Sequence, residues 1–167
     1  PSGQHVHASP VLMRYLYELS LLERAFSGGF DGMRLLEIGG GYGGFAVTVC
    51  AFHRPATYSI VDLTYAGKLQ SKYIKYSGST VPLRTVSTSN RNIVQSDLLV
   101  SFFSISEQRS DVVDLYVDIY VAHARRGYLQ LNWDEGNCGG AANRKYDQSR
   151  YSVWHLWQRV RQVQAKA

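Results

Sequence analysis

The sequence predicts an α/β fold with a doubly wound, mainly parallel sheet, and three observations lead to this prediction. Short apolar segments typical of buried strands alternate with helical segments along most of the chain. A glycine-rich turn joins the first predicted strand to a helix, and an acid ends the second strand. Strands that alternate with helices require crossover connections, so the sheet should be parallel with right-handed connections.

Composition limits the classes of protein to which the chain can belong. Its 167 residues, 45% of them apolar, suffice for one domain with a hydrophobic core. The net charge is 18 − 13 = +5 without a basic block, so nucleic acid is not an expected partner. Cys50 and Cys138 show neither metal spacing nor a disulfide framework, which favours a reducing, cytoplasmic location. No apolar run is long enough to span a bilayer, and no signal-peptide pattern opens the chain.

The glycine-rich turn is the most informative stretch of the sequence. Five glycines lie between Gly39 and Gly44, after a strand predicted over residues 33–38 and before a helix predicted from Phe45 to Phe52. Glycine tolerates positive φ angles and lets the backbone approach a ligand closely. The stretch therefore predicts a nucleotide-type binding loop.

Two cofactors fit the spacing of these glycines. Gly39-x-Gly41-x-x-Gly44 satisfies the dinucleotide fingerprint, in which a helix N-terminus holds a pyrophosphate. Glu37-x-Gly39-x-Gly41-x-Gly43 satisfies the first motif of methyltransferases that use S-adenosylmethionine (SAM). A carboxylate at Glu37 would repel a pyrophosphate, but it suits the ammonium of the methionine part of SAM. We therefore expect SAM as the cofactor, and an NAD-dependent oxidoreductase is the alternative.

Asp62 ends the strand predicted over residues 57–62 and is the second candidate contact for a nucleotide. A carboxylate at this strand end offers two acceptors to the two ribose hydroxyls. The alternative interpretation is that Asp62 caps the helix that follows. Beyond the next predicted strand, the polar loop over residues 87–90 could reach an adenine edge.

The remaining elements follow from periodicity and from start and stop signals. Ser9 and Pro10 open a helix in the favoured way, with Ser as N-cap and Pro in the first turn. One face of that helix carries leucines and should pack on the sheet: Leu12, Leu16, Leu19 and Leu22. We further predict helices over residues 68–76 and about 107–124, and strands over residues 83–87, 97–103 and 128–133.

The end of the strand over residues 97–103 should lie beside the glycine loop, at the crevice where doubly wound sheets bind ligands. Phe103 and Ser104 are therefore candidate cofactor contacts. Ser104-x-x-Glu107 is also a capping box, in which both side chains bond free backbone N–H groups at a helix start. That structural role is the first interpretation of Glu107, and a catalytic base is the alternative.

Four blocks of the sequence, taken together, resemble one known family. They cover residues 37–44, 60–63, 101–107 and 128–132. The first block, three consecutive glycines followed by Tyr-Gly-Gly, is the most specific. The sequence resembles the sugar O-methyltransferase family of class I SAM-dependent methyltransferases from about Tyr15 to Asn132. This resemblance implies a Rossmann-like fold and methyl transfer from SAM to a hydroxyl of a sugar or glycan.

The resemblance also implies roles for individual residues. The methionine end of SAM would lie against Glu37, Gly39, Gly41, Tyr42 and Gly43. Asp62 would bind the ribose and Leu63 would flank the adenine. Ser104 and Glu107 would lie near the methyl acceptor.

Catalysis by such a protein depends mainly on alignment, because SAM carries its own leaving group. A sugar hydroxyl is a poor nucleophile and benefits from a base. The candidate bases, in order of preference, are Glu107, His123, Asp134 and His155. No carboxylate and histidine cluster has metal spacing, so we expect a metal-independent reaction. A methyltransferase-like domain that binds partners or nucleic acid without catalysis is a further alternative, which the +5 charge permits.

We expect one domain over residues 1–167. Its parts are an N-terminal helical segment (1–30), a cofactor-binding core (31–133) and a loop with a C-terminal segment (134–167). The resemblance implies a C-terminal antiparallel hairpin, for which the residues after Asn132 are too few and too polar. The chain also starts at Pro1 and not at Met. We therefore expect either a sheet truncated at its C-terminal hairpin or a sequence that lacks internal loops. The start at Pro1 indicates that residues were removed or that the chain is a piece of a longer protein.

Overall fold

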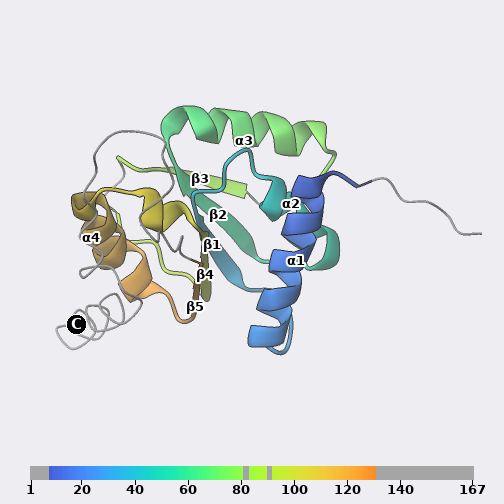
Figure 1. Ribbon diagram of the computed structural model, residues 1–167, viewed down its shortest axis with the longest axis horizontal. Helices are drawn as coiled ribbons and strands as arrows, with labels where there is room; N and C mark the ends of the chain where they lie inside the picture. The colour runs from blue at the N-terminus through green and yellow to red at the C-terminus, as the bar shows by residue number, and fades with distance from the viewer. Residues whose placement is uncertain (1–7, 81–82, 90–91, 131–167) are drawn as a thin grey trace, which may run out of the picture.

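The computed structural model describes residues 8–80, 83–89 and 92–130 as a sheet flanked by helices (Figure 1). The sheet has five strands in the order β3-β2-β1-β4-β5, and each neighbouring pair is parallel. The predicted α/β fold with a doubly wound parallel sheet is confirmed. None of the helices in the described ranges is long and apolar enough to cross a membrane.

The elements largely match the segments predicted from the sequence. In chain order they are α1 (Pro10–Ala25), β1 (Arg34–Ile38), α2 (Gly44–Phe52), β2 (Thr57–Asp62), α3 (Thr64–Tyr76), β3 (Leu83–Ser87), β4 (Leu98–Phe102), the 3₁₀ helix η1 (Ser104–Glu107), α4 (Ser110–Ile119), the 3₁₀ helix η2 (Val121–His123) and β5 (Gly127–Gln130). The strands at residues 57–62 and 83–87 have the predicted bounds, whereas α3 starts four residues earlier than predicted. The last residues of the strand predicted over 128–133 lie outside the described residues.

Each face of the sheet carries its own hydrophobic core. On one face, Leu35 and Tyr58 join the core under α1 and α2. On the other, Leu36 and Leu99 pack with the apolar side of α4 (Figure 1). Successive residues of a strand point to opposite faces, so strands covered on both sides need nearly continuous apolar sequence. This is why β1 and β4 were recognisable as buried strands.

Helix α1 begins as predicted, but the leucine face that we predicted is only partly the buried one. The Ser9 hydroxyl accepts a hydrogen bond from the Leu12 N–H at 3.1 Å, which confirms the N-cap. The Leu12 side chain is 41% exposed, whereas Tyr15, Glu18 and Leu22 are buried. Leu12 lies one turn before Tyr15, in the part of α1 that extends past the core. The spacing of the leucines correctly predicted which face of α1 is buried, since Leu19 and Leu22 are in the core. It could not show which turns of that face the core covers.

The helix predicted over residues 107–124 is wrong at both ends. The chain forms η1 first, starts α4 only at Ser110, and ends in η2. The predicted capping box does not form, because Ser104 lies inside η1 and Phe103 occupies the N-cap position without a side-chain hydrogen bond. Phe103 has a φ angle of 67°, which turns the chain sharply as it leaves β4. The capping-box motif is present in the sequence, but because of this turn Ser104 does not occupy the N-cap position of a helix.

Candidate functional site

The glycine loop and Asp62 lie side by side at the carboxyl edge of the sheet. Strands β1 and β2 are parallel and in register, with Ile38 opposite Val61. The Gly39 N–H extends this pairing by donating to the Val61 carbonyl at 2.9 Å. Asp62 is the next residue of β2, so its side chain starts beside the loop. The structure therefore brings these two predicted site elements together.

The glycines hold the loop in a shape that other residues would not adopt readily. Gly39 has a φ angle of 78° and Gly41 one of 55°, both in the left-handed region that favours glycine. A Cβ atom on Gly39 would overlap the side chain of Ser104, which therefore packs directly on the loop. A Cβ atom on Gly41 would meet nothing within 4 Å among the described residues. The loop is closed on the Ser104 side and open at Gly41.

Gln70 of α3 joins the loop to Asp62. Its side-chain nitrogen donates one hydrogen bond to the Gly41 carbonyl and one to Asp62 Oδ2, both at 3.0 Å. The Leu63 N–H donates to Asp62 Oδ1 at 2.8 Å, so both oxygens of the carboxylate are held. Sequence reasoning missed Gln70, although its spacing of four from the buried Ile74 could have indicated an inward-facing position.

The Asp62 carboxyl is half-buried, and this burial raises its pKa above the ordinary value. Hydrogen bonds from the N–H groups of Leu63 and Gly41 and from Gln70 act in the opposite direction. Asp62 does not cap the following helix, because Leu63 holds the N-cap position of α3 and that helix start has no side-chain cap. Of the two interpretations from the sequence, the ligand-binding one is compatible with this geometry.

Glu37 lies beneath the loop and is only 3% exposed. The Tyr58 hydroxyl donates a hydrogen bond to Glu37 Oε2 at 2.9 Å, and the same oxygen lies 3.3 Å from where a Cβ atom on Gly40 would stand. Burial raises the pKa of Glu37 to about 7, while the Tyr58 hydrogen bond lowers it and the nearby Glu18 and Asp62 raise it. Glu37 thus supports the loop from below, and the glycine backbone separates it from the open side.

A second buried acid, Glu18 of α1, lies close enough to Glu37 to interact with it electrostatically. Its side chain is 3% exposed and forms an ion pair with Arg14 at 3.5 Å. Glu18 Oε2 is buried without a hydrogen-bond partner among the described residues. Burial raises the pKa of Glu18, and Arg14 lowers it. The sequence did not single out Glu18, because an acid on an apolar helix face has no motif of its own.

Aromatic rings close the α1 side of the loop. The Tyr42 ring packs edge-on against Tyr73 at 4.7 Å between centroids and against Tyr15 at 6.1 Å. Rings of Tyr15 and Tyr42 also fill the space beside Gly44, where a Cβ atom would clash with both. Tyr42 was predicted to lie at the methionine end of a cofactor, and the structure puts it at the base of the glycine turn.

A cavity of about 110 Å³ lies next to Asp62, between α3 and the ends of β2 and β3. Its lining is Ile60, Asp62, Leu63, Thr64, Gly67, Gln70, Thr85, Val86 and Ser87. Leu63 lines it and is also 45% exposed, as suits a residue that would flank a ring. Pockets that enclose small ligands measure about 300–1,000 Å³, so this cavity would take only part of a nucleoside.

Hydroxyl groups border this cavity on the side of the polar loop after β3. Ser87 Oγ lies 3.0 Å from Thr64 Oγ1 and 2.8 Å from Ser89 Oγ. The Thr88 N–H donates to the Asp62 carbonyl at 3.1 Å, which ties the loop to the end of β2. Of the loop hydroxyls that we expected near an adenine edge, that of Ser87 therefore lines the cavity, and it is bonded to Thr64 and Ser89.

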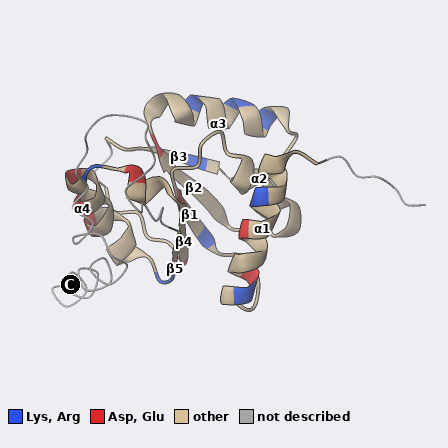
Figure 2. Ribbon diagram, in the orientation of Figure 1, with Lys and Arg blue, Asp and Glu red and all other residues tan. Residues whose placement is uncertain are grey.

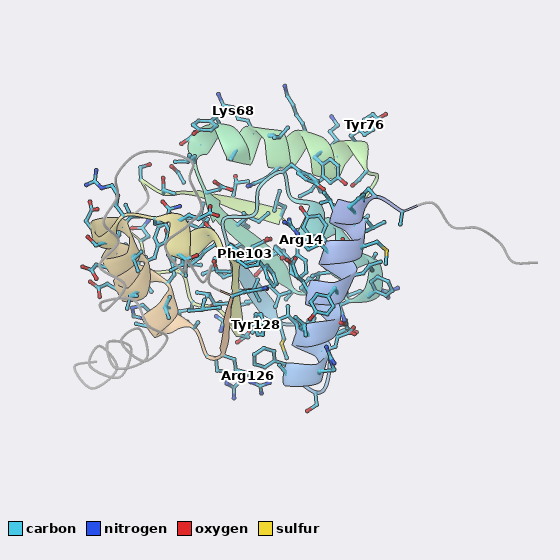
Figure 3. The ribbon with its side chains drawn as sticks, viewed as in Figure 1. Arg14, Lys68, Tyr76, Phe103, Arg126 and Tyr128 are labelled. Atoms are coloured by element: carbon cyan, nitrogen blue, oxygen red, sulfur yellow. The ribbon has the colours of Figure 1, made fainter. Side chains whose placement is uncertain are left out.

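The structure separates the two catalytic candidates that it describes. Phe103 follows β4 at the carboxyl edge of the sheet (Figure 3). Ser104 and Glu107 begin and end η1, which follows Phe103, and therefore belong to the same edge. His123 ends η2 just before β5, and its carbonyl accepts from the Ser96 N–H at the start of β4. His123 is thus at the amino edge of the sheet, far along the strands from the glycine loop. Topology does not bring it together with Glu107.

Several other candidates cannot be compared with the structure. Asp134 and His155 lie outside the described residues, as do the residues after Asn132, which we predicted to be too few and too polar for a C-terminal hairpin. Within the described ranges, no group of three or more His, Cys, Asp or Glu side chains could hold a metal ion.

Comparisons with known proteins address the fold. No protein-family model and no curated protein matches the chain. Among solved structures, a SAM-dependent methyltransferase from Aquifex aeolicus has a TM-score of 0.62 at 13% identity, over 93% of this chain and 82% of that one. SAM-bound CalS10, an amino pentose methyltransferase from Micromonospora echinaspora, has a TM-score of 0.56 at 13% identity, over 80% and 60% of the two chains.

The PH0226 protein from Pyrococcus horikoshii has a TM-score of 0.55 at 16% identity, over 70% of this chain and 54% of that one. The chain spans about half the length of several solved structures that it matches. At such low identity the similarity establishes the fold alone. The chain has the Rossmann-like fold of the class I SAM-dependent methyltransferases.

Proposed function

We propose that this chain is the cofactor-binding part of a SAM-dependent methyltransferase that methylates a hydroxyl of a sugar or glycan. One observation carries the proposal: Asp62 and the open Gly41 lie together at the carboxyl edge of the sheet, joined by Gln70. Ligands of doubly wound sheets bind at this edge, where the strand order reverses. Here the reversal falls between β1 and β4, beside the glycine loop.

Each part of the site suits one part of SAM. Asp62 presents carboxylate oxygens to the ribose hydroxyls, with Leu63 and the adjacent cavity available to the adenine. The backbone around Gly41 is open to the chain that links ribose and methionine. Glu37, beneath the loop, supplies negative charge toward the methionine ammonium once a ligand cation favours its ionised form. The ammonium would interact with Glu37 through the loop or through water, because the side chain itself is buried.

When bound, SAM supplies a methyl group on a sulfonium, which is an excellent leaving group. The chain's own contribution is then to hold the acceptor oxygen in line with the methyl group and sulfur, and to accept the acceptor's proton. Glu107 is the proposed base, because it follows β4 at the same edge as the glycine loop. His123 was the second candidate and is not carried forward, since it belongs to the opposite edge.

Two similarities favour a sugar or glycan as the methyl acceptor. The resemblance of residues 37–44 and 101–107 to sugar O-methyltransferases favours it, and CalS10, which shares the fold, acts on an amino pentose. Coclaurine N-methyltransferase also shares the fold, with a TM-score of 0.53 at 10% identity. The fold therefore accommodates different acceptor atoms, and the acceptor has to be tested directly.

Titration of the purified chain with SAM, S-adenosylhomocysteine (SAH) and NADH tests the cofactor, with isothermal titration calorimetry as the readout. We expect binding of SAM and SAH and none of NADH at the same concentrations. An Asp62→Ala variant should lose affinity for both sulfur nucleosides, because it removes the acceptors for the ribose. Preferential binding of NADH would overturn the proposal and support the oxidoreductase alternative.

Transfer of a labelled methyl group from SAM to a panel of sugars, glycans and nucleotides tests the acceptor. Labelled sugar is the expected product. Binding of SAH without any labelled product would favour a methyltransferase-like binding domain.

A further inference from the structure

We propose that Gln70 is a positioning residue that fixes the ribose-binding carboxylate of Asp62 against the glycine loop. The inference rests on the proposed function and adds to it a residue that the sequence motifs do not contain. Gln70 is 0% exposed and comes from α3, outside both the loop and the strand that it joins. Gln70 lines the cavity beside Asp62 but has no exposed surface, so it would act through Asp62 and Gly41.

The orientation of the Gln70 amide follows from its partners. The Gly41 carbonyl and Asp62 Oδ2 can only accept hydrogen bonds, so the group that faces both must be the NH₂, which has two hydrogens to donate. With the Leu63 N–H on Asp62 Oδ1, both oxygens of the carboxylate are held before any ligand arrives. A group held in advance loses less freedom on binding, which increases affinity.

The same orientation carries a cost that the fold alone does not explain. Gln70 Oε1 is buried and has no hydrogen-bond partner among the described residues. A buried polar atom without a partner destabilises a protein, and a methionine of similar length would avoid this. A residue that breaks a packing rule inside a binding site, while bonding two of its elements, indicates selection for binding over stability.

The test compares thermal stability with SAH affinity in the same variants. Gln70→Met removes both hydrogen bonds and also the unpartnered oxygen. We expect its melting temperature to stay close to that of the wild type and its affinity for SAH to fall by about tenfold, the loss of one well-placed hydrogen bond to a charged group. Lys72→Met, on the exposed side of the same helix, is the matched control and should change neither quantity.

The variant Gln70→Glu allows a second test, the pH dependence of SAH affinity, which would not change if Gln70 had only a structural role. Its carboxyl group would lie against Asp62 and could donate to Oδ2 only when protonated. Relative to the wild type at each pH, its SAH affinity should therefore improve as the pH falls from 8 to 6, whereas that of Gln70→Met should remain flat.

Three results would overturn the inference. If Gln70→Met loses stability and affinity together, Gln70 is a structural residue. If it keeps full affinity, Gln70 does not position Asp62. If the wild type itself binds no SAH, the proposed function fails and the inference fails with it, which separates that outcome from the other two.

Discussion

At the scale of single residues, the least expected feature is an acid sealed beneath the glycine loop. Glu37 was predicted as a direct or water-mediated contact for a cation, and the structure puts it out of reach of solvent with Tyr58 as its hydrogen-bond partner. Burial disfavours the charged carboxylate, so its pKa rises to about 7. The charge of the loop region therefore depends on pH in the neutral range.

This titration predicts how stability varies with pH. An unfolded Glu37 loses its proton near its ordinary pKa, whereas the folded one keeps it to about pH 7. The native state binds more protons in between, so stability present in acid is lost as the pH rises through 7. Glu37→Gln should match the wild type at pH 4.5 and exceed it by roughly 3 kcal/mol at pH 8. Urea unfolding at both pH values measures this.

Glu18 has a raised pKa for the same reason and should leave a pH slope of the same sign in Glu37→Gln. A Glu18→Gln/Glu37→Gln double variant is the control, and its stability should be the flattest with pH. Equal pH slopes in the wild type and Glu37→Gln would show that Glu37 is ionised in the fold at neutral pH.

Glu107 carries a prediction about catalysis. Glu107→Gln keeps the size of the side chain but cannot accept a proton, so kcat should fall by about 10²- to 10⁴-fold. SAH affinity should stay unchanged, since no cofactor role is assigned to this side chain. Asp111→Asn, the same exchange on an exposed residue of α4, is the matched control. Full activity of Glu107→Gln in the labelled-methyl assay would remove it as the base.

At the scale of elements, the glycine loop and η1 fit together as a pair. Gly39 has positive φ and no room for a Cβ atom, because the Ser104 side chain fills that space. Gly39→Ala should therefore destabilise the fold by about 2–4 kcal/mol, about 1–2 from left-handed strain and the rest from overpacking. The double variant Gly39→Ala/Ser104→Gly should recover the overpacking part and leave the strain.

Chemical denaturation of both variants and of Ser104→Gly alone completes this double-mutant cycle. A double variant as unstable as the sum of the two singles would mean that Gly39 and Ser104 do not share that space.

The sequence predicted elements well where one signal dominated. The buried strand over residues 57–62 and the Ser9 cap needed only local pattern and hydrogen-bond chemistry. The prediction from sequence failed for the segment after β4. Phe103 there has a positive φ angle, which is costly for a non-glycine residue and which no local sequence rule favours. That single turn converts a predicted capping box into η1 and delays α4 to Ser110.

The residues of the candidate site fall into two groups: those that belong to a sequence motif, and those whose place depends on tertiary contacts. The positions of Gly39 and Asp62 at the carboxyl edge could be predicted from the sequence. A tight turn requires the positive φ angle that glycine allows, and Asp62 directly ends a strand. Gln70 and Glu18 could not be predicted in this way, because a buried polar residue within an amphipathic helix resembles an ordinary surface residue until its partners are known. The lysines of α3 made Gln70 harder to recognise as a buried residue. They are exposed, the helix contains no acid, and its polar residues therefore suggested a solvated face (Figure 2).

At the scale of the whole molecule, the proposed cofactor site and the Arg34–Asp97 ion pair lie at opposite edges of the sheet. At the amino edge, the Arg34 guanidinium bonds both oxygens of Asp97, at 3.1 Å and 3.0 Å, and the Arg34 N–H adds a third bond at 2.9 Å. These contacts join the starts of β1 and β4. Hydrogen bonds from Arg34 hold the pKa of Asp97 down at about 2.

The sign of this second titration is opposite to that of Glu37. A lowered pKa in the fold gives stability that is present above the unfolded pKa, near 4, and lost as the pH falls through about 2. Asp97→Asn should cost about 1 kcal/mol at pH 7, since the pair is partly exposed, and nothing near pH 2. Urea unfolding at both pH values tests this, and an equal deficit at pH 2 would contradict it.

The separation of the two edges also gives the protein a convenient handle for experiments. Arg126 is exposed next to the start of β5, at the edge remote from the glycine loop (Figure 3). A cysteine introduced there would anchor the chain to a biosensor surface, or carry a fluorophore, with the glycine loop facing free solution. Cys138 would first be replaced by serine. Cys50, which is partly buried against the core and has its pKa raised to about 11, would compete little for the same thiol reagent at neutral pH.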